Sequence, residues 1–265
     1  MLKFSKLLTE LIFCNSNNEK EKILIKYLNN ASIEEAGYTI GALTNSIKFD
    51  NIKAHKIKDF VKKKTDKVLF DLSYDYAGDL ADTISLIWID KKNITNNNNK
   101  KSLIDVIKSL NNKNTDLEEY VINFLDNNNV NERWAFIKLL LGGFRVGVSV
   151  EFIKNTLAKY GKKEKNDIEK IWNGLKPPYI SLIKWLRNTG EYPSIKLNET
   201  FHSMMLANSM DIKKHLSSIN HEEHLVEYKW DGIRTQISCK DSITRIYSRT
   251  GEDITNSFPE IKLKF

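Results

Sequence analysis

A lysine with a carboxylate and an arginine nearby stands in the segment Glu-Tyr-Lys-Trp-Asp-Gly-Ile-Arg, at residues 227–234. The residues on both sides are rich in Val, Ile, Tyr and Thr, which predicts that Lys229 ends a strand just before a turn. A lysine held there beside another cation loses its proton more easily than a solvated lysine, whose pKa is about 10.4. Arg234 would be that cation. A lysine in that setting is able to act as a covalent nucleophile, which makes Lys229 a candidate for this role.

The same residues also have a plainer interpretation. Asp231 and Gly232 favour a hairpin turn, with Lys229 and Arg234 pointing to solvent, and Lys-x-Asp-Gly taken alone favours that hairpin. A second segment bears on the choice. Ser-Arg-Thr-Gly-Glu-Asp follows at 248–253, and Phe-Pro-Glu comes after it at 258–260. Two ordered segments are harder to obtain by chance than one.

The elements before these segments are predicted to be helices. Apolar residues recur at three- and four-residue spacing, or a capping pair such as Ser32 and Glu35 opens the segment. On these grounds we predict helices over residues 2–13, 19–28, 32–40, 79–89 and, after the pair Thr115 and Glu118, 117–125. The polar residues 93–101 are predicted to form a loop.

Three further helical features surround a glycine-rich turn. Asn131 is predicted to cap a helix that contains Trp134 and Leu140, and Gly142 and Gly143 supply the left-handed geometry that ends it. Ser149 is predicted to cap the next helix, which Gly161 stops, and a final helix spans 179–187.

Short segments of strand character follow the helices. Residues 225–230, 233–239 and 243–248 are predicted strands, with turns at Asp231-Gly232 and Lys240-Asp241. The composition changes between residues 190 and 201. We therefore place a domain boundary there, with an all-helical domain over 1–195 and a sheet-containing one over 196–265.

Composition excludes some classes of protein and favours a polyanionic partner. The 265 residues carry a net charge of +7, but a bias toward Lys, Asn and Ile in the coding sequence would also supply lysines that only solvate the surface. Cys14 and Cys239 form no disulfide framework or metal spacing, which fits a reducing cytosol. Every apolar run is far shorter than the roughly 20 residues that a membrane crossing needs.

The lysine segment resembles the nucleotidyl-lysine motif of ATP-dependent DNA ligases, and 248–260 resembles their second nucleotide-contacting segment. The resemblance implies that Lys229 attacks the α-phosphate of ATP and holds AMP. It also implies that Glu227 selects adenine, and that Arg234 and Arg249 contact the ribose and phosphates. Residues 201–207 resemble the lead-in to this domain, with Met204 where the family commonly has Pro.

Two helical stretches also resemble the DNA-binding domain of these ligases. Residues 132–149 resemble the place where a glycine turn joins two helices, and 71–88 resembles bacterial members. Backbone amides near Gly147, with the helix start at Ser149 and the charge of Arg145, would bind a phosphate whatever the base sequence. Taken alone, the turn would be an ordinary packing corner; beside a nucleotidyl-lysine motif, we favour the DNA interpretation.

The resemblance implies a multi-domain chain. An all-α N-terminal DNA-binding domain is followed by the truncated start of an α+β nucleotidyltransferase (ATP-grasp-like) adenylation domain, while the oligonucleotide-binding (OB-fold) domain and the metal ligands would lie beyond Phe265. The partners it implies are ATP, Mg²⁺ and nicked double-stranded DNA, with no membrane. The expected protein is a monomer of the cytoplasm, associated with the bacterial nucleoid, which seals nicks in repair, replication and recombination. This fragment alone is not expected to complete the cycle.

Two other functions stay open at this point. An RNA ligase or a capping guanylyltransferase shares the Lys-x-Asp-Gly core, but these enzymes lack the helical domain. An inert helical DNA-binding module would carry the first domain without catalysis by the second. Discrimination between nicked DNA and RNA ends, and covalent AMP on Lys229, separate these alternatives from a DNA ligase.

Overall fold

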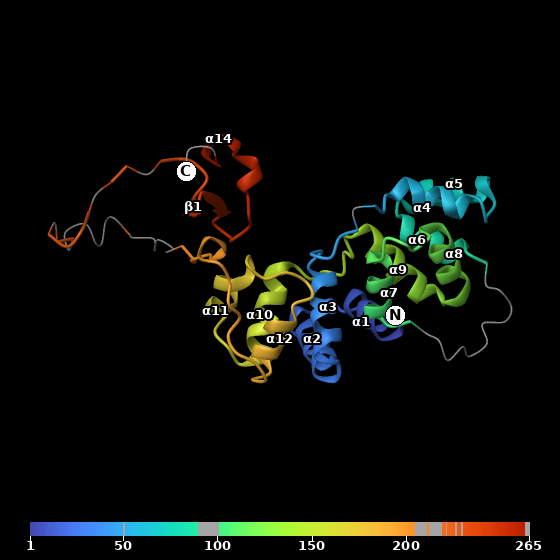
Figure 1. Ribbon diagram of the computed structural model, residues 1–265, viewed down its shortest axis with the longest axis horizontal. Helices are drawn as coiled ribbons and strands as arrows, with labels where there is room; N and C mark the ends of the chain where they lie inside the picture. Colours follow the sequence, from blue (N-terminus) through green and yellow to red (C-terminus); the bar gives the residue numbers. More distant parts are fainter. Residues whose placement is uncertain are drawn as a thin grey trace. The chain divides into compact units, whose positions relative to one another are not determined.

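The computed structural model describes most of the chain: residues 1–49, 51–89, 101–204, 211, 219–220, 222–225, 227–228 and 230–262. These residues form two units, one made of residues 1–163 with 176–193, the other of 164–175 with 194–265. The described part is rich in helices and has one sheet of two strands. The expected helical character of the N-terminal part is confirmed, and Figure 1 shows both units.

The described residues of the first unit form helices joined by loops. They are α1 (Leu2–Phe13), α2 (Asn17–Asn30), α3 (Ile33–Leu43), α4 (Ala54–Lys62), α5 (Lys67–Ala77), α6 (Leu80–Ile87), α7 (Leu103–Asn111), α8 (Leu117–Asn127), α9 (Val130–Leu141), α10 (Val150–Gly161) and α12 (Ile180–Leu186). Helix α9 packs against α6 and α1, and α10 packs against α2 and α12. The loop between α9 and α10 therefore starts and ends on well-packed helices.

Side-chain caps fix where these helices begin. The predicted caps Ser32 and Ser149 are confirmed, because their hydroxyls accept from the amides of Glu35 and Phe152. Two other predicted caps are wrong. The hydroxyl of Thr115 donates to the Ser109 carbonyl, so Asp116 caps α8 instead, and Asn129 rather than Asn131 caps α9.

A cation without any exposed surface lies inside this unit. Arg133 on α9 donates from Nε to the carbonyl of Leu125 at 2.7 Å and from Nη1 to that of Trp88 at 3.0 Å. Both carbonyls lie at or near the C-terminal ends of helices, where the chain leaves acceptors without a helical partner. Arg133 thus joins α9 to the ends of α6 and α8.

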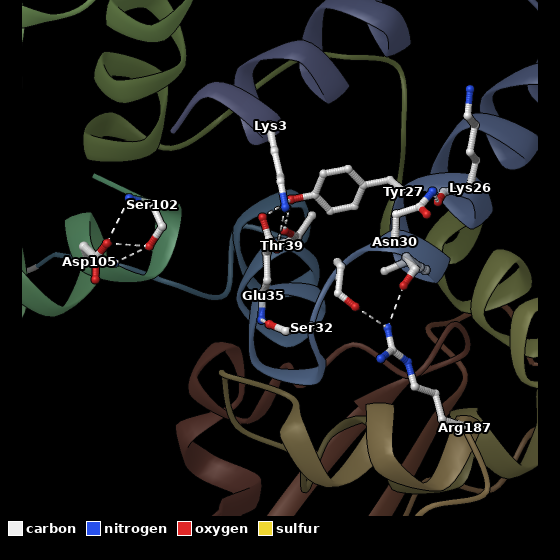
Figure 2. Close-up of polar contacts among 12 residues, drawn as sticks. Lys3, Lys26, Tyr27, Asn30, Ser32, Glu35, Thr39, Ser102, Asp105 and Arg187 are labelled. Atoms are coloured by element: carbon white, nitrogen blue, oxygen red, sulfur yellow. Dashed lines mark hydrogen bonds and ion pairs between the residues drawn. The ribbon is translucent and has the colours of Figure 1, made fainter. Parts of the chain in front are cut away.

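Figure 2 shows a second polar cluster, between α2, α3 and α12. The Tyr27 hydroxyl lies 3.2 Å from Thr39 Oγ1 and donates to Glu35 at 3.4 Å, and burial holds the pKa of this phenol well above its ordinary value. Arg187 Nη2 donates to the carbonyls of Leu28 and Ala31 at 2.6 and 2.9 Å. The end of α2 is therefore anchored by a basic side chain, as α6 and α8 are.

The second unit contains the only strands of the described residues. It comprises α11 (Lys165–Trp172), η1 (Leu197–Glu199), β1 (Thr235–Lys240), β2 (Ile243–Ser248), η3 (Thr255–Ser257) and α14 (Pro259–Lys262). Helix α11 precedes the boundary predicted at 195–196, yet it belongs to this unit. The hydroxyl of buried Tyr247 donates to the Asn198 carbonyl at 2.9 Å. This contact ties β2 to the segment that follows the helices.

The predicted hairpin is confirmed, but its turn lies one residue later than the predicted Lys240-Asp241, because Lys240 still belongs to β1. Strands β1 and β2 pair antiparallel from Thr235 with Ser248 to Lys240 with Ile243, so two residues form the turn. These residues, Asp241 and Ser242, have φ of 52° and 60°, the left-handed values that a two-residue type I′ turn requires.

The strand predicted at 225–230 is wrong for the residues that the structure describes there, because none of them lies in a strand. Leu225, Tyr228 and Trp230 are 86 to 89% exposed, so their apolar side chains gain no packing that would hold an extended segment. The predicted loop at 93–101 lies, except for Lys101, outside the described residues. No helix of the described part has both the length and the apolar character that a membrane crossing requires.

Asp79 supports a prediction about stability and pH. Burial raises the pKa of this carboxyl, but the Lys138 ammonium at 2.5 Å and the amides of Asp82 and Ala81 outweigh burial and lower it below 3.8. The ionised form therefore stabilises the fold above that pH, and this contribution is lost as the pH falls through the folded pKa. Asp79→Asn keeps the cap but loses the charge, so the free energy of unfolding should fall by about 1 kcal/mol at pH 7.

Urea unfolding followed by circular dichroism at pH 7 and pH 3 measures this effect. The loss of stability in Asp79→Asn should be smaller at the lower pH, because the contribution of the ionised wild-type carboxyl falls once the pH is below the ordinary pKa of an aspartate. Asp75→Asn, which changes an exposed carboxylate on α5, is the matched control and should unfold like the wild type. An equal deficit at both pH values would show that the charge of Asp79 does not stabilise the helical unit.

Candidate functional site

The loop of residues 142–149 takes a backbone course that favours glycine. Gly142, Gly143 and Gly147 have φ of 75°, 74° and 71°, and Arg145 has φ of 51°. A Cβ at position 142 would lie 2.5 Å from the amide oxygen of Asn45, so the loop also needs glycine there for space. The predicted helix end at Gly142 is confirmed, with positive φ at Gly142 and Gly143, although the ψ of 174° at Gly142 lies outside the left-handed helical region.

Ser149 starts α10 at the surface. Its side chain is exposed, and its hydroxyl accepts from the amide of Phe152 at 3.1 Å. Glu151 follows in the first turn of this 12-residue helix. The helix N-terminus carries a partial positive charge from its aligned peptide dipoles, which favours an anion at this end.

The three residues predicted to contact DNA lie around one hollow. A depression of about 400 Å³ is lined by Arg145, Gly147 and Ser149, together with Asn17, Val148 and Phe152. Arg145 also lines a second hollow of about 150 Å³, which includes Asp79, Lys138 and Gly143. The side chain of Arg145 is exposed. The fold therefore brings together a guanidinium, glycine backbone and a helix start, as the sequence predicts.

Two lysines near this loop were missed by the sequence argument. Lys20 on α2 is only 8% exposed, and its ammonium donates to the carbonyls of Val146 and Gly147 at 3.0 and 3.4 Å. Lys138 on α9 is 7% exposed and pairs with Asp79. The burial of Lys20 could have been predicted from its spacing. It precedes the buried Leu24 and Leu28 at four-residue intervals, so it falls on the buried face of α2.

The nucleotide segment is described only in part. Lys229, the predicted nucleophile, lies outside the described residues, whereas Glu227 is described and exposed. Arg234 directly precedes β1 and Arg249 directly follows β2, and both are exposed. Because Thr235 pairs with Ser248, the register places Arg234 and Arg249 at the same end of the hairpin. Two predicted phosphate-contacting arginines thus flank the same end of the two-stranded sheet.

The described carboxylates of this unit do not form a metal site. Among the residues that the structure describes, no group of three or more His, Cys, Asp or Glu side chains is placed to hold a metal ion. Asp253 lies instead near Arg245, with 3.5 Å between the carboxylate oxygen and the guanidinium nitrogen. Its other oxygen accepts from the hydroxyl of Thr255.

Comparison with known proteins matches both parts of the chain to the same group. Residues 204–265 match the model of the ATP dependent DNA ligase domain. The DNA ligases of Methanococcus aeolicus and Methanothrix thermoacetophila are each 31% identical over 134 and 130 residues, which is 49% and 47% of this chain and 24% and 22% of theirs. That of Methanocaldococcus jannaschii is 30% identical over 126 residues, 47% of this chain and 22% of its own.

The matched part of the chain therefore spans about a quarter of the length of these relatives. The matches do not separate a bacterial type from other members. The lysine segment and the residues around Arg249 both lie inside the matched domain, which agrees with the two motifs found in the sequence. On this evidence the chain is similar to DNA ligases, and its residues 204–265 match the ATP dependent DNA ligase domain.

Proposed function

We propose that this chain is part of an ATP-dependent DNA ligase that seals nicks in duplex DNA through a covalent lysine-AMP intermediate. The domain match over residues 204–265 is the observation that carries the proposal, because it contains the lysine segment. Residues 1–195 form the DNA-binding domain, and residues 196–265 begin the nucleotidyltransferase (ATP-grasp-like) adenylation domain. The exposed glycine loop of the helical unit supports the first of these assignments.

Lys229 performs the first transfer in this proposal. The lone pair of Nζ attacks the α-phosphorus of ATP, a P–N bond forms, and the bond from that phosphorus to the bridging oxygen breaks as pyrophosphate leaves. The proton of the amine passes to solvent. In the second transfer AMP moves from Lys229 to the 5′-phosphate of the nick, and in the third the 3′-hydroxyl attacks that phosphate and AMP leaves.

The side chains around the lysine orient the nucleotide. Arg234 and Arg249 share one end of the hairpin and are exposed, so both guanidiniums can reach an anionic ligand from the same side. They contact the phosphates and ribose in this proposal, while Glu227 selects adenine. The residues of this chain contribute mainly position and charge, and Mg²⁺ bound with the nucleotide would supply further charge neutralisation.

The helical unit binds the duplex through its phosphates. The loop of residues 142–149 offers backbone amides, the start of α10 and the charge of Arg145, none of which distinguishes one base from another. Such contacts suit a ligase, because nicks occur in any sequence. Repair, replication and recombination all produce such nicks, and in this proposal the protein acts on them as a monomer.

Covalent AMP on Lys229 is the direct test of the proposed chemistry. The complete protein should retain radiolabel from [α-³²P]ATP on a denaturing gel, and Lys229→Ala should abolish the label because the proposed nucleophilic amine is removed. Lys240→Ala, which changes an exposed lysine at the end of β1, is the matched control and should label like the wild type. Labelling that survives in Lys229→Ala would contradict the assigned nucleophile.

Arg145 tests the proposed DNA contact separately from the chemistry. In fluorescence anisotropy with a nicked duplex, Arg145→Ala should lower affinity and reduce the slope of log K against log salt by about one phosphate contact. Lys113→Ala, an exposed lysine between α7 and α8, should change neither. Two duplexes of different sequence should give the same result.

The same assay separates a DNA ligase from the RNA-directed enzymes. Nicked DNA should bind more tightly than an RNA duplex of matched length. Equal or tighter binding of RNA would instead favour an RNA ligase or a capping enzyme.

A further inference from the structure

Lys20 has an unusual environment for a lysine on an amphipathic helix. It is 8% exposed, on the same stripe of α2 as the fully buried Leu24 and Leu28. Lysine is almost never buried unless its ammonium has partners, because removing the charge from water is costly. Its partners are the carbonyls of Val146 and Gly147, more than 120 residues away in the chain. The interaction therefore fixes the loop of residues 142–149 to α2.

The choice of these two carbonyls sets the direction of two amides. In a trans peptide the C=O of one residue and the N–H of the next point in opposite directions. The Val146 carbonyl faces Lys20, so the Gly147 N–H points away from it. The same holds for the Gly147 carbonyl and the Val148 N–H. Both amides belong to residues that line the 400 Å³ hollow beside Arg145 and Ser149.

These two amides are also available to a ligand. Within the described part of the chain, no backbone carbonyl accepts a hydrogen bond from the amide of Gly147 or Val148. Successive amides that point to one side bind anions well, and hydrogen bonds from amides to a phosphate are charge-assisted. The hollow thus combines two convergent donors with the guanidinium of Arg145.

Gly147 is required by the same arrangement. Its φ of 71° favours glycine, and a Cβ at this position would collide with Nζ of Lys20. The absence of a side chain therefore allows the ammonium to approach the backbone closely enough to bind both carbonyls. Lys20 and Gly147 therefore depend on each other structurally, although they lie on segments far apart in the sequence.

We propose that Lys20 is a positioning residue, whose ammonium holds the loop so that the amides of Gly147 and Val148 point outward and bind one phosphate of the duplex. This inference rests on the proposed DNA-binding function of the loop. Lys20 itself does not touch DNA, because it is buried beneath the peptides that it orients. Its effect on affinity passes through neutral amides, which distinguishes it from an exposed lysine that pairs with a phosphate.

The test measures the binding of a fluorescein-labelled nicked 20-base-pair duplex by the 265-residue chain and its variants. Lys20→Met should weaken binding by about tenfold, the effect of losing one or two hydrogen bonds to a charged group. The slope of log K against log salt should stay close to that of the wild type, because no phosphate-paired cation is lost. Lys22→Met, at an exposed position of the same helix, is the matched control for charge and should bind within about twofold of the wild type.

A second measurement reports on the loop directly. In ¹⁵N-labelled wild-type protein, the amide resonances of Gly147 and Val148 should shift when inorganic phosphate is added, and they should no longer shift in Lys20→Met. Gly147→Ala, which leaves the lysine in place but blocks its approach, should lose the same shift at position 148. This variant keeps the test decisive if Lys20→Met does not fold by circular dichroism.

The outcomes separate the inference from the function on which it rests. If Lys20→Met binds the duplex as tightly as Lys22→Met, or keeps the phosphate-induced shifts, Lys20 does not position the loop. A loss of affinity with a salt slope reduced by one full contact would show that Lys20 pairs with DNA itself, and would also overturn the inference. A wild-type chain that binds no duplex would contradict the proposed function of the helical unit.

Discussion

Hydrogen bonds from buried and half-buried basic side chains to backbone carbonyls join separate segments of the helical unit. Lys20, Arg133 and Arg187 each donate to two carbonyls, at a loop or at or near the end of a helix. The backbone carbonyls at the C-terminal end of a helix have no helical donor, and a cation removed from water needs hydrogen-bond acceptors. A bond between the two therefore satisfies both groups. Apart from the bond from Arg133 to Leu125, these bonds join segments distant in sequence, and the one from Lys20 fixes the loop of residues 142–149 to a packed helix.

This arrangement divides the positive charge of the chain into two roles. The buried cations organise the backbone, whereas exposed ones such as Arg145, Arg234 and Arg249 are accessible to anions. Net charge alone therefore says little about function, and the bland interpretation of lysines as solvated surface groups holds for many of them. What favours nucleic acid is the placement of Arg145 beside the glycine backbone and the start of α10.

Local chemistry made much of the fold predictable. A serine that caps a helix and a glycine that ends one act through their own side chain or backbone. The roles of Ser32, Ser149, Gly142 and Gly143 could therefore be predicted from the residues next to them. The caps at Thr115 and Asn131 were misplaced because several residues with capping side chains adjoin one another, and tertiary packing selects Asp116 and Asn129. The strand at 225–230 failed because strand-forming residues need a partner. Lys20 was missed because its acceptors lie more than 120 positions away; the assignment of Lys229 stays a prediction.

The central claim is that the loop between α9 and α10 binds the DNA backbone through its own amides. A crystal structure of the chain with a nicked duplex tests this most directly. The account predicts a phosphate oxygen within about 3 Å of the amide nitrogen of Gly147 or Val148, with Arg145 alongside. A duplex bound on another face of the helical unit, with this hollow open to solvent, would contradict it.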